Sequence, residues 1–563
     1  MSLRLLYLWR TLRHLRGRQM AAQVMHRFRP VLESPARFGA RHAPPFPGRS
    51  GRSIFPSVWS GRPQPAAAEC RRGRFAFLDR SEALGWPPEW ARADLPRLWQ
   101  YHLHYFDWLL GLGYADAREA VRDWIRAHPL GRGRVGWEPY PISVRLPNWC
   151  AFFFGRFAEE TERDAPFLAE LWPSLYRQAE WLARHLEFRL MGNHLFENGA
   201  ALCLAGDCFR GGAAERWRRI GRGILEREFP EQVLADGMHF ERSPMYHQRM
   251  SALALALAAV EDPTVRALAA ARLPRMVAAL GAVCHPDGGI ALFNDSALGA
   301  AMDARAFLDL ARHQVPAARS LPPPPPGAWA LREAGYYGFR SADGSFAICD
   351  AGDVGPDYIP GHAHGDIFSF ELSLQEQRVI VDAGVYDYER GAMRDYCRST
   401  AAHNTVEIGG QDQCEFWDVF RVARRGRPRD VVWQPSPHGF RLTGWHDGYA
   451  RLRGSPRHRR EFVWEAPSTL RVRDSVHSAR PVRAVSRLHL HPACWPQLAG
   501  DREAVVDHPA GRFRIALTGA GVMRLEDSLY CPEFGVQVAN RCVTVALEGK
   551  EIQTGFVITP ADE

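Results

Sequence analysis

Histidine, tyrosine and carboxylate residues gather in three short segments of this 563-residue sequence. The densest segment, GHAHGD at Gly361–Asp366, contains His362 and His364 and precedes a run of alternating apolar and polar residues. Asp382 and His403 follow in neighbouring segments that are predicted to be strands. Two or three histidines with one carboxylate from adjacent strands form an ordinary zinc ligand set. An HxH pair alone is weak support, since the same spacing recurs in LHLHP. The cluster therefore indicates either a metal site or a polar packing region.

The second segment, DGMHFERSPMYH, offers a tyrosine that could transfer a proton. Tyr246 needs a nearby positive charge or metal to lower its pKa, and Arg242 lies four residues before it. Pro244 interrupts a regular helix between the two residues. The alternative is a half-buried tyrosine of an apolar helical domain.

The third segment, GNHLFENG, contains Asn193, His194, Glu197 and Asn198. On a helix, His194 and Glu197 would share one face, where the carboxylate could orient the imidazole. The alternative interpretation is a turn that serves capping and packing.

Two different periodicities predict the elements that position these residues. Residues 81–320 repeat apolar side chains three and four apart, as in PFLAELWPSLYRQAEWLARHL, which predicts a domain of paired helices. Five prolines at 322–326 predict a stiff linker over 321–328. Residues 329–563 alternate with period two in short runs such as FSFELSL, which predicts an antiparallel β-sandwich. Residues 1–80 are expected to form a basic helical or extended segment. The fold class is thus α+β and multidomain.

Composition excludes several function classes. Lys550 is the only lysine and closes the run VTVALEGK, so a phosphate-loop nucleotidase or a pyridoxal enzyme is not expected. The eleven cysteines form no CxxC pair, which predicts reduced, mostly buried thiols. The net charge of +8 suits an anionic partner, which at this point could be nucleic acid, a membrane or an acidic polysaccharide.

The basic first thirty residues bear on location. Their apolar run is too short for a signal-peptide core, so the protein is expected in the cytoplasm or exported by a non-classical route, with the periplasm as an alternative. No transmembrane segment is expected. This stretch could touch a membrane surface peripherally as a basic amphipathic helix, or pack on the next domain as a solvated helix. The sequence leaves the oligomeric state open.

Taken together, the motifs resemble those of the heparinase II/III family of polysaccharide lyases. The matching segments are NHLFENGAALCLAGDCF, DGMHFERSPMYHQRM and DGGIALFNDSA in the first half, and GHAHGDIFSFEL, VDAGVYDY and RSTAAHNTVEI in the second. The resemblance implies an incomplete (α/α) toroid followed by antiparallel sheets, with the substrate in the cleft between them. It also implies cleavage of a uronate-containing polysaccharide by β-elimination, so we expect an anionic polysaccharide and no nucleic acid as the partner.

The resemblance implies a role for each site residue. Tyr246 would take the C5 proton and protonate the leaving oxygen, with His194 and His362 beside it. Asn193 or Asn198 would help to neutralise the uronate carboxylate. Because they lie close in sequence to these motifs, the further expected substrate contacts are Glu197, Arg242, Tyr388, Arg398 and Trp417. A structural zinc ion would be held by His364, Asp382 and His403.

Two features of the sequence depart from the degradative lyases of the family. We recognise no signal peptide in the first thirty residues, and on this ground we expect a member that remodels exopolysaccharide. The near absence of lysine removes a residue type common in sulfate-binding clefts. A uronate C5-epimerase, a non-catalytic glycan-binding protein of an export system and a zinc-dependent hydrolase remain as alternatives.

Overall fold

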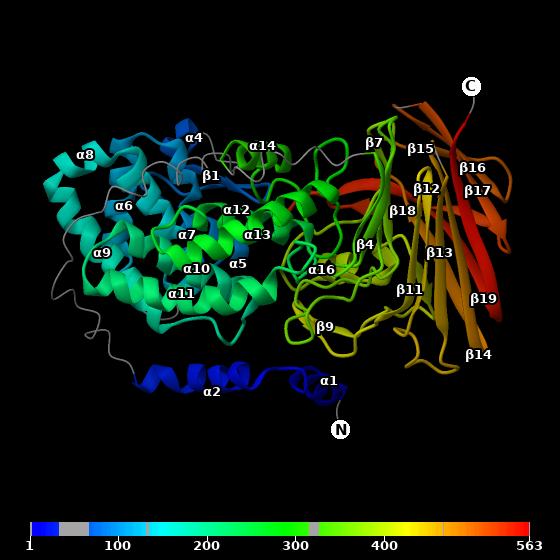
Figure 1. The fold of residues 1–563 in the computed structure, drawn as a ribbon, viewed down its shortest axis with the longest axis horizontal. Coiled ribbons are helices and arrows are strands. Elements are labelled where there is room, and N and C mark those ends of the chain that lie inside the picture. Colours follow the sequence, from blue (N-terminus) through cyan, green and yellow to red (C-terminus); the bar gives the residue numbers. More distant parts are fainter. Residues whose placement is uncertain are drawn as a thin grey trace.

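Helices fill the first half of the chain and antiparallel strands fill the second half (Figure 1). The computed structural model describes residues 3–32, 67–130, 134–314, 326–465, 467–509 and 511–561. The helical domain contains the longer helices α5 (Arg97–Tyr105), α6 (Tyr114–Ala127), α7 (Pro139–Cys150), α9 (Ala165–Arg184), α10 (Gly192–Cys208), α11 (Gly212–Gln232), α12 (Pro244–Leu257), α13 (Pro263–Ala282) and α14 (Ala304–Gln314). Shorter pieces are α4 (Ala67–Arg71), α8 (Ala158–Arg163), η3 (Asp107–Gly111), η4 (Val135–Trp137) and the π-helical turn η5 (Ala151–Arg156).

Helix formation follows the apolar spacing and the capping residues. In α6, the buried residues Ala117, Ala120, Val121 and Trp124 follow the i, i+3, i+4, i+7 pattern of a helix with one buried face. By contrast, α10 is buried on nearly every side because it runs through the centre of the domain. The tryptophans of this domain mostly fill its aromatic core; Trp99, Trp108, Trp124, Trp149 and Trp217 are fully buried.

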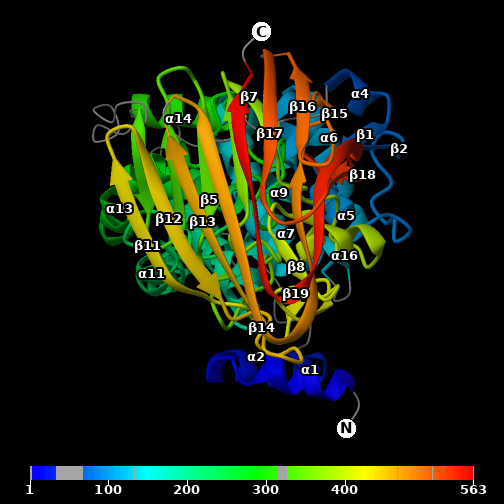
Figure 2. The ribbon, with the colours of Figure 1, turned by 90° about the vertical axis from the view of Figure 1, so that its right-hand side faces the viewer.

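The strands form two large antiparallel sheets. One has five strands in the order β3 (Gly327–Leu331), β4 (Tyr336–Arg340), β5 (Phe346–Asp350), β6 (Phe370–Leu374) and β7 (Gln377–Ile380). The other has ten strands, which Figure 2 shows from the outer face: β11 (Pro428–Ser436), β12 (Gly439–His446), β13 (Arg457–Glu465), β14 (Thr469–His489), β19 (Val538–Pro560), β17 (Gly511–Gly519), β16 (Glu503–His508) and β15 (Trp495–Leu498), with β18 (Met523–Tyr530) on β19 and β8 (Val406–Ile408) on β14. Two small hairpins, β1 (Arg74–Phe77) with β2 (Arg80–Ala83) and β9 (Phe416–Asp418) with β10 (Arg421–Val422), lie outside these sheets.

The five-stranded sheet is the middle layer of the molecule. Tyr336, Phe346 and Ile348 pack into the core of the helical domain. Their neighbours Tyr337 and Ala347 point to the opposite face and share a core with the ten-stranded sheet. Because both of its faces are covered, this sheet fixes the helical domain against the outer sheet, and the loops at its ends reach the helices (Figure 1). The predicted order of a helical domain followed by antiparallel sheets is confirmed.

Helices α1 (Leu3–Leu12) and α2 (Gly17–Leu32) run along one side of the molecule, below both halves in Figure 1. Residues 33–66 and most of the predicted linker, 321–325, lie outside the described residues. The end of that prediction, Gly327 and Ala328, belongs to β3. All eleven cysteines are buried and, in the described part of the chain, free of disulfides, as expected.

Candidate active site

A cleft of about 750 Å³ lies where the helical domain meets the loops of the sheets. Its wall comes from three parts of the chain that are far apart in sequence. The helical domain contributes Tyr101, Tyr105, Tyr140, Asn193, His194, Tyr246 and Arg249; the sheet loops contribute His362, Tyr388 and Phe420; α1, α2 and the turn between them contribute Thr11, Leu15, Gln19 and Gln23. The cleft therefore brings together residues from all three of the short segments singled out in the sequence.

Tyr246 and His362 form the centre of the cleft. Their rings stack with centroids 3.9 Å apart, and the Tyr246 hydroxyl lies 3.3 Å from the hydroxyl of Tyr388. Tyr246 is held at the start of α12, where its backbone N–H donates to the side chain of Ser243, the N-cap residue. Burial raises the pKa of Tyr246 above its ordinary value, although the hydrogen bond with Tyr388 opposes the shift.

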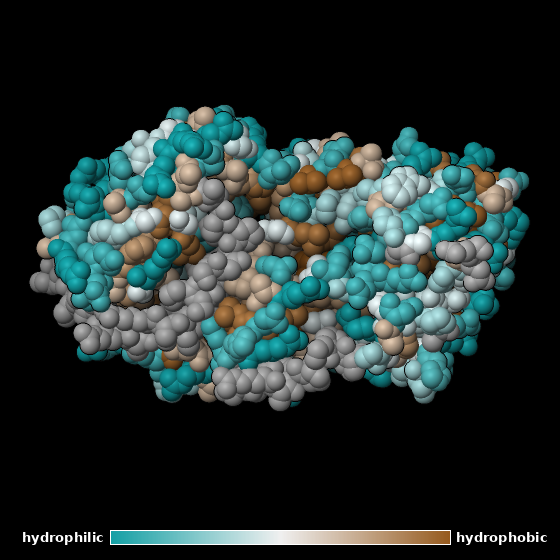
Figure 3. Space-filling model, turned by 90° about the horizontal axis from the view of Figure 1, so that it is seen from above, coloured by the Kyte–Doolittle hydropathy of each residue, from teal (hydrophilic) through white to brown (hydrophobic). Residues whose placement is uncertain are grey.

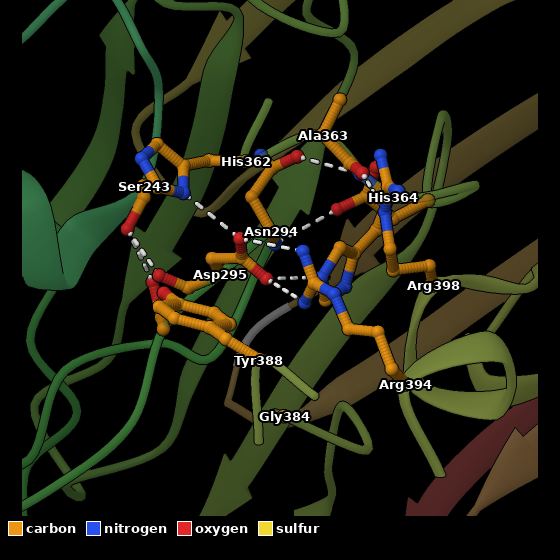
Figure 4. A network of polar contacts seen from close by, with 12 residues as sticks. Ser243, Asn294, Asp295, His362, Ala363, His364, Gly384, Tyr388, Arg394 and Arg398 are labelled. Atoms are coloured by element: carbon orange, nitrogen blue, oxygen red, sulfur yellow. Dashed lines mark hydrogen bonds and ion pairs between the residues drawn. The ribbon is translucent and has the colours of Figure 1, made fainter. Parts of the chain in front are cut away.

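Asp295 organises the polar network around His362 (Figure 4). Its carboxylate lies 2.8 Å from His362 Nδ1 and 2.9 Å from His364 Nε2, and it accepts both amino groups of Arg394 from α16 (Ala392–Arg398). Burial alone would raise the pKa of Asp295, but Arg394 and the two histidines hold it well below the usual range. One ionised carboxylate thus fixes the ring orientation of His362.

His194 has a separate carboxylate partner. Its Nδ1 lies 3.2 Å from Glu187, and its ring packs on Tyr140 with centroids 4.3 Å apart. Burial would raise the pKa of Glu187, but His194 and the amide of Asn198 more than offset this, so the pKa lies below its ordinary value. The predicted orientation of His194 by Glu197 is corrected, because Glu187 takes that role.

Glu241 links the helical domain with the sheet loops. One of its oxygens accepts the backbone N–H of Asn193 at 2.9 Å, and the other lies 3.4 Å from His362 Nε2. Gly192 allows this approach: its φ is +54°, and a Cβ at this position would collide with the Glu241 carboxylate. Burial raises the pKa of Glu241. The side-chain oxygen of Asn193 is buried in the cleft wall without a described partner.

Positive charge dominates the cleft wall. Its charged lining residues in the described part of the chain, besides the histidines, are six arginines, Arg97, Arg189, Arg249, Arg390, Arg421 and Arg425, and two acids, Glu389 and Asp418. Arg249 forms a two-bond ion pair with buried Glu197, at 2.8 and 3.1 Å, and lies over the ring of Tyr140. Such a wall favours an anionic ligand.

Five residues that we predicted to contact substrate do not line the cleft. Glu197 pairs with Arg249, and Asn198 is fully buried between Glu187 and Ser143.

The other three also have structural partners. Arg242 donates to the carbonyls of Asp353 and Glu333, pointing away from Tyr246. Buried Arg398 binds the carbonyls of Ala363, Asp418 and Val419, and Trp417 donates to Thr11. These five side chains position the walls of the cleft instead of facing its interior.

The predicted zinc ligands lie together beside the Asp295 network. His403 Nδ1 is 2.7 Å from Asp382, and the rings of His364 and His403 are 5.4 Å apart. As placed, no group of three or more His, Cys, Asp or Glu side chains among the described residues could hold a metal ion. Two buried ring nitrogens, His364 Nδ1 and His403 Nε2, have no described partner. These free donors suit a metal, so zinc stays a prediction.

Sequence reasoning missed Asp295, Arg394, Glu187, Glu241 and Arg249. Arg249 could have been found, since it follows Tyr246 by three residues and so shares its helix face. Asp295 stands in the quoted segment DGGIALFNDSA, but nothing in the sequence links it with His362. Glu187 and Arg394 give no local signal, because their partners are brought to them only by the packing of distant elements.

Comparison with known proteins finds matches to both halves of the chain. Residues 98–317 match the family model described as heparinase II/III N-terminus, and residues 323–559 match the one described as heparinase II/III-like, C-terminal. A heparin-sulfate lyase of Pedobacter heparinus is 27% identical over 376 residues, which cover 60% of this chain and 56% of the relative. A heparin-sulfate lyase of Bacteroides stercoris is 23% identical over 426 residues, covering 67% and 61%. The matches thus span little more than half of these relatives.

Solved structures share the fold over nearly the whole chain. A crystal structure of heparinase III has a TM-score of 0.72 at 16% identity and covers 94% of this chain and 88% of its own. A mutant heparan sulfate lyase from Pedobacter heparinus has a TM-score of 0.62 at 20% identity, covering 97% and 89%. At such identities the likeness concerns the fold alone.

Proposed function

Because the chain belongs to the heparinase II/III family, we propose that it is a polysaccharide lyase that cleaves a uronate-containing anionic polysaccharide by β-elimination. One observation carries this proposal. The phenol of Tyr246 and the imidazoles of His194 and His362 line one arginine-rich cleft between the two halves of the molecule. The named heparin-sulfate lyases among the relatives support the same class of reaction.

The reaction removes the proton at C5 of the uronate and breaks the bond between C4 and the glycosidic oxygen. The electron pair of the C5–H bond moves toward the carboxylate and then forms the C4–C5 double bond. Donors near that carboxylate stabilise the developing negative charge, typically by about 2–4 kcal/mol for one well-placed donor. We assign this role to the side chain of Asn193, with the cleft arginines binding the polymer.

Tyr246 is assigned both proton transfers. Burial keeps its pKa above the ordinary value, so the phenol of the free protein carries its proton at neutral pH. Only the small fraction of protein in which Tyr246 is ionised can therefore act as the base. After Tyr246 has taken the C5 proton, its phenol can protonate the leaving oxygen. His194, held by Glu187, and His362, held by Asp295, are placed to share the charge around it.

We also propose a structural zinc ion and a natural polymer substrate. His364, Asp382 and His403 would hold the zinc ion, which when bound would tie the loops of the sheets together without taking part in the elimination. The natural polymer is assigned to an exopolysaccharide that the protein remodels, whose carboxylates the cleft arginines can bind and whose sugar rings the cleft aromatic side chains can pack on.

The test is incubation of the protein with a panel of uronate polymers in deuterated buffer. The panel includes heparan sulfate, unsulfated uronate polymers and bacterial exopolysaccharides. A lyase produces a new ultraviolet absorbance from the unsaturated uronate in step with chain cleavage. Deuterium at C5 without cleavage would assign the protein to the epimerases, and cleavage without a double bond would indicate hydrolysis. Tight binding with no change in any polymer would indicate a non-catalytic glycan-binding protein.

A further inference from the structure

Helices α1 and α2 bridge the two halves of the molecule across the cleft. Arg10 forms a two-bond ion pair with Glu415 of the sheet half, at 2.9 Å for each bond. Arg16 pairs with Glu231 of the helical domain and lies 3.8 Å above the ring of Tyr358. Buried Gln19 donates to the carbonyl of Tyr358 at 3.2 Å. The inner face of this helix pair is therefore fixed to both halves.

The outer face of the same helices is apolar. Leu5, Leu8, Trp9 and Leu12 are exposed on α1, with 58% of the Trp9 surface open to solvent. Their spacing of i, i+3, i+4 and i+7 places them in one stripe. Met20, Val24 and Met25 continue the exposed apolar surface on α2. We call these seven residues the outer stripe.

This concentration is peculiar to the helix pair. Twelve large apolar side chains are exposed in the described part of the chain, and the outer stripe contains seven of them. Figure 3 views the face turned away from α1 and α2, where hydrophilic residues predominate among the coloured atoms and apolar residues gather mainly toward the middle. Large apolar patches on an exposed surface mark a binding surface.

The charge around the outer stripe selects the kind of partner. Residues 3–32 contain no aspartate or glutamate. Arg4, Arg13 and Arg27 are exposed beside the stripe, whereas Arg10, Arg16 and Arg18 turn toward acidic residues of the body. A helix that is apolar on one side, rich in arginine and free of acids is the kind that lies in the headgroup region of an anionic bilayer.

We propose that α1 and α2 dock the protein on the surface of an anionic lipid bilayer through the outer stripe. The helices do not insert across the bilayer, since no described helix is both long and apolar enough to span it. Leucine, methionine and tryptophan side chains enter the headgroup region while Arg4, Arg13 and Arg27 contact lipid phosphates. The opposite face of the helices lines the cleft, so docking holds the cleft beside the membrane. The proposal does not depend on the chemistry of the cleft.

The test is sedimentation of the full chain with vesicles of phosphatidylglycerol and phosphatidylcholine, compared with vesicles of phosphatidylcholine alone. We expect binding to the anionic vesicles that weakens as ionic strength rises. The variant Leu8→Ser/Trp9→Ser should bind at least about tenfold more weakly, because two apolar side chains no longer leave water. Arg4→Gln/Arg13→Gln should reduce binding to anionic vesicles specifically.

The matched control is Trp495→Ser/Leu498→Ser, which removes two equally exposed apolar side chains from β15. This control should bind vesicles as the unchanged protein does, and all variants should keep the same melting temperature. The proposal fails if the unchanged protein does not bind anionic vesicles, or if Leu8→Ser/Trp9→Ser binds them as strongly as the unchanged protein does. A stable dimer that Leu8→Ser/Trp9→Ser converts to monomer, without vesicle binding, would show instead that the outer stripe joins two copies of the chain.

Discussion

The substitution Asp295→Asn tests the network that positions His362. Asp295 is fully buried and faces Arg394, whose side chain is itself buried. Asparagine keeps the size of the side chain but removes the negative charge, which leaves the Arg394 guanidinium buried without a counter-charge. Breaking a buried ion pair in this way costs about 3–5 kcal/mol of the free energy of unfolding. The hydrogen-bonding with His362 and His364 is weakened as well, so the loss should lie in that range or above it.

The assay is urea denaturation followed by tryptophan fluorescence, with Asp309→Asn as the matched control. Asp309 also pairs with an arginine, Arg312 at 3.0 Å, but its side chain is 60% exposed on α14. An exposed pair contributes at most about 1 kcal/mol, so the control should unfold almost as the unchanged protein does.

The double variant Asp295→Asn/Arg394→Gln should lose less stability than the sum of its single variants, because each single change already breaks the shared pair. The reasoning is refuted if Asp295→Asn costs no more than Asp309→Asn. It is also refuted if the two single losses simply add.

Two further predictions concern pH. If Tyr246 is the base, kcat/KM, which follows ionisation of the free protein, should rise about tenfold per pH unit from neutral into alkaline solution, because the raised pKa of Tyr246 leaves little phenolate at neutral pH. A kcat/KM that levels off near neutrality would point to an imidazole base. Burial raises the pKa of Asp207 to about 6. The folded protein therefore keeps a proton on Asp207 that the unfolded chain releases at lower pH. The stability that comes from binding this proton is lost as pH rises from about 4 to 6. Asp207→Asn should therefore be more stable than the unchanged protein by about 2–3 kcal/mol at pH 8 and no more stable at pH 4; equal differences in urea denaturation at the two values would contradict this.

The periodicity of the sequence predicted the fold because local patterns dominate both halves. Apolar spacing in α6 and alternation in β13 follow from which face each element buries. Strand β6 shows where this reasoning stops. Its alternation suggests one polar face, yet Glu371 and Ser373 are buried against the helical domain, where both contact His285. A sheet covered on both sides can carry buried polar residues whose partners belong to another domain.

The site was predictable only in part, for the same physical reason. Tyr246, His194 and His362 stand in recognisable motifs, and the structure places all three at the cleft. The supporting charges were not predictable, because the partners are distant in sequence: Asp295 and Arg394 are separated by 99 positions. Local spacing suggested that Arg242 lies beside Tyr246 and lowers its pKa. The left-handed φ of +57° at Arg242 instead turns the chain, so that the Arg242 side chain reaches the carbonyls of Glu333 and Asp353.

The account depends most directly on the phenol of Tyr246. The decisive measurement is the initial rate of ultraviolet absorbance from unsaturated uronate, on a polymer that the unchanged protein cleaves, for Tyr246→Phe and for Tyr176→Phe. Tyr176 loses the same hydroxyl group on α9, where its ring packs on Trp217 away from the cleft. We predict that Tyr246→Phe binds the polymer but loses at least about a hundredfold in kcat, while Tyr176→Phe keeps its full rate. A folded Tyr246→Phe protein that produces the unsaturated product at the unchanged rate would contradict the account.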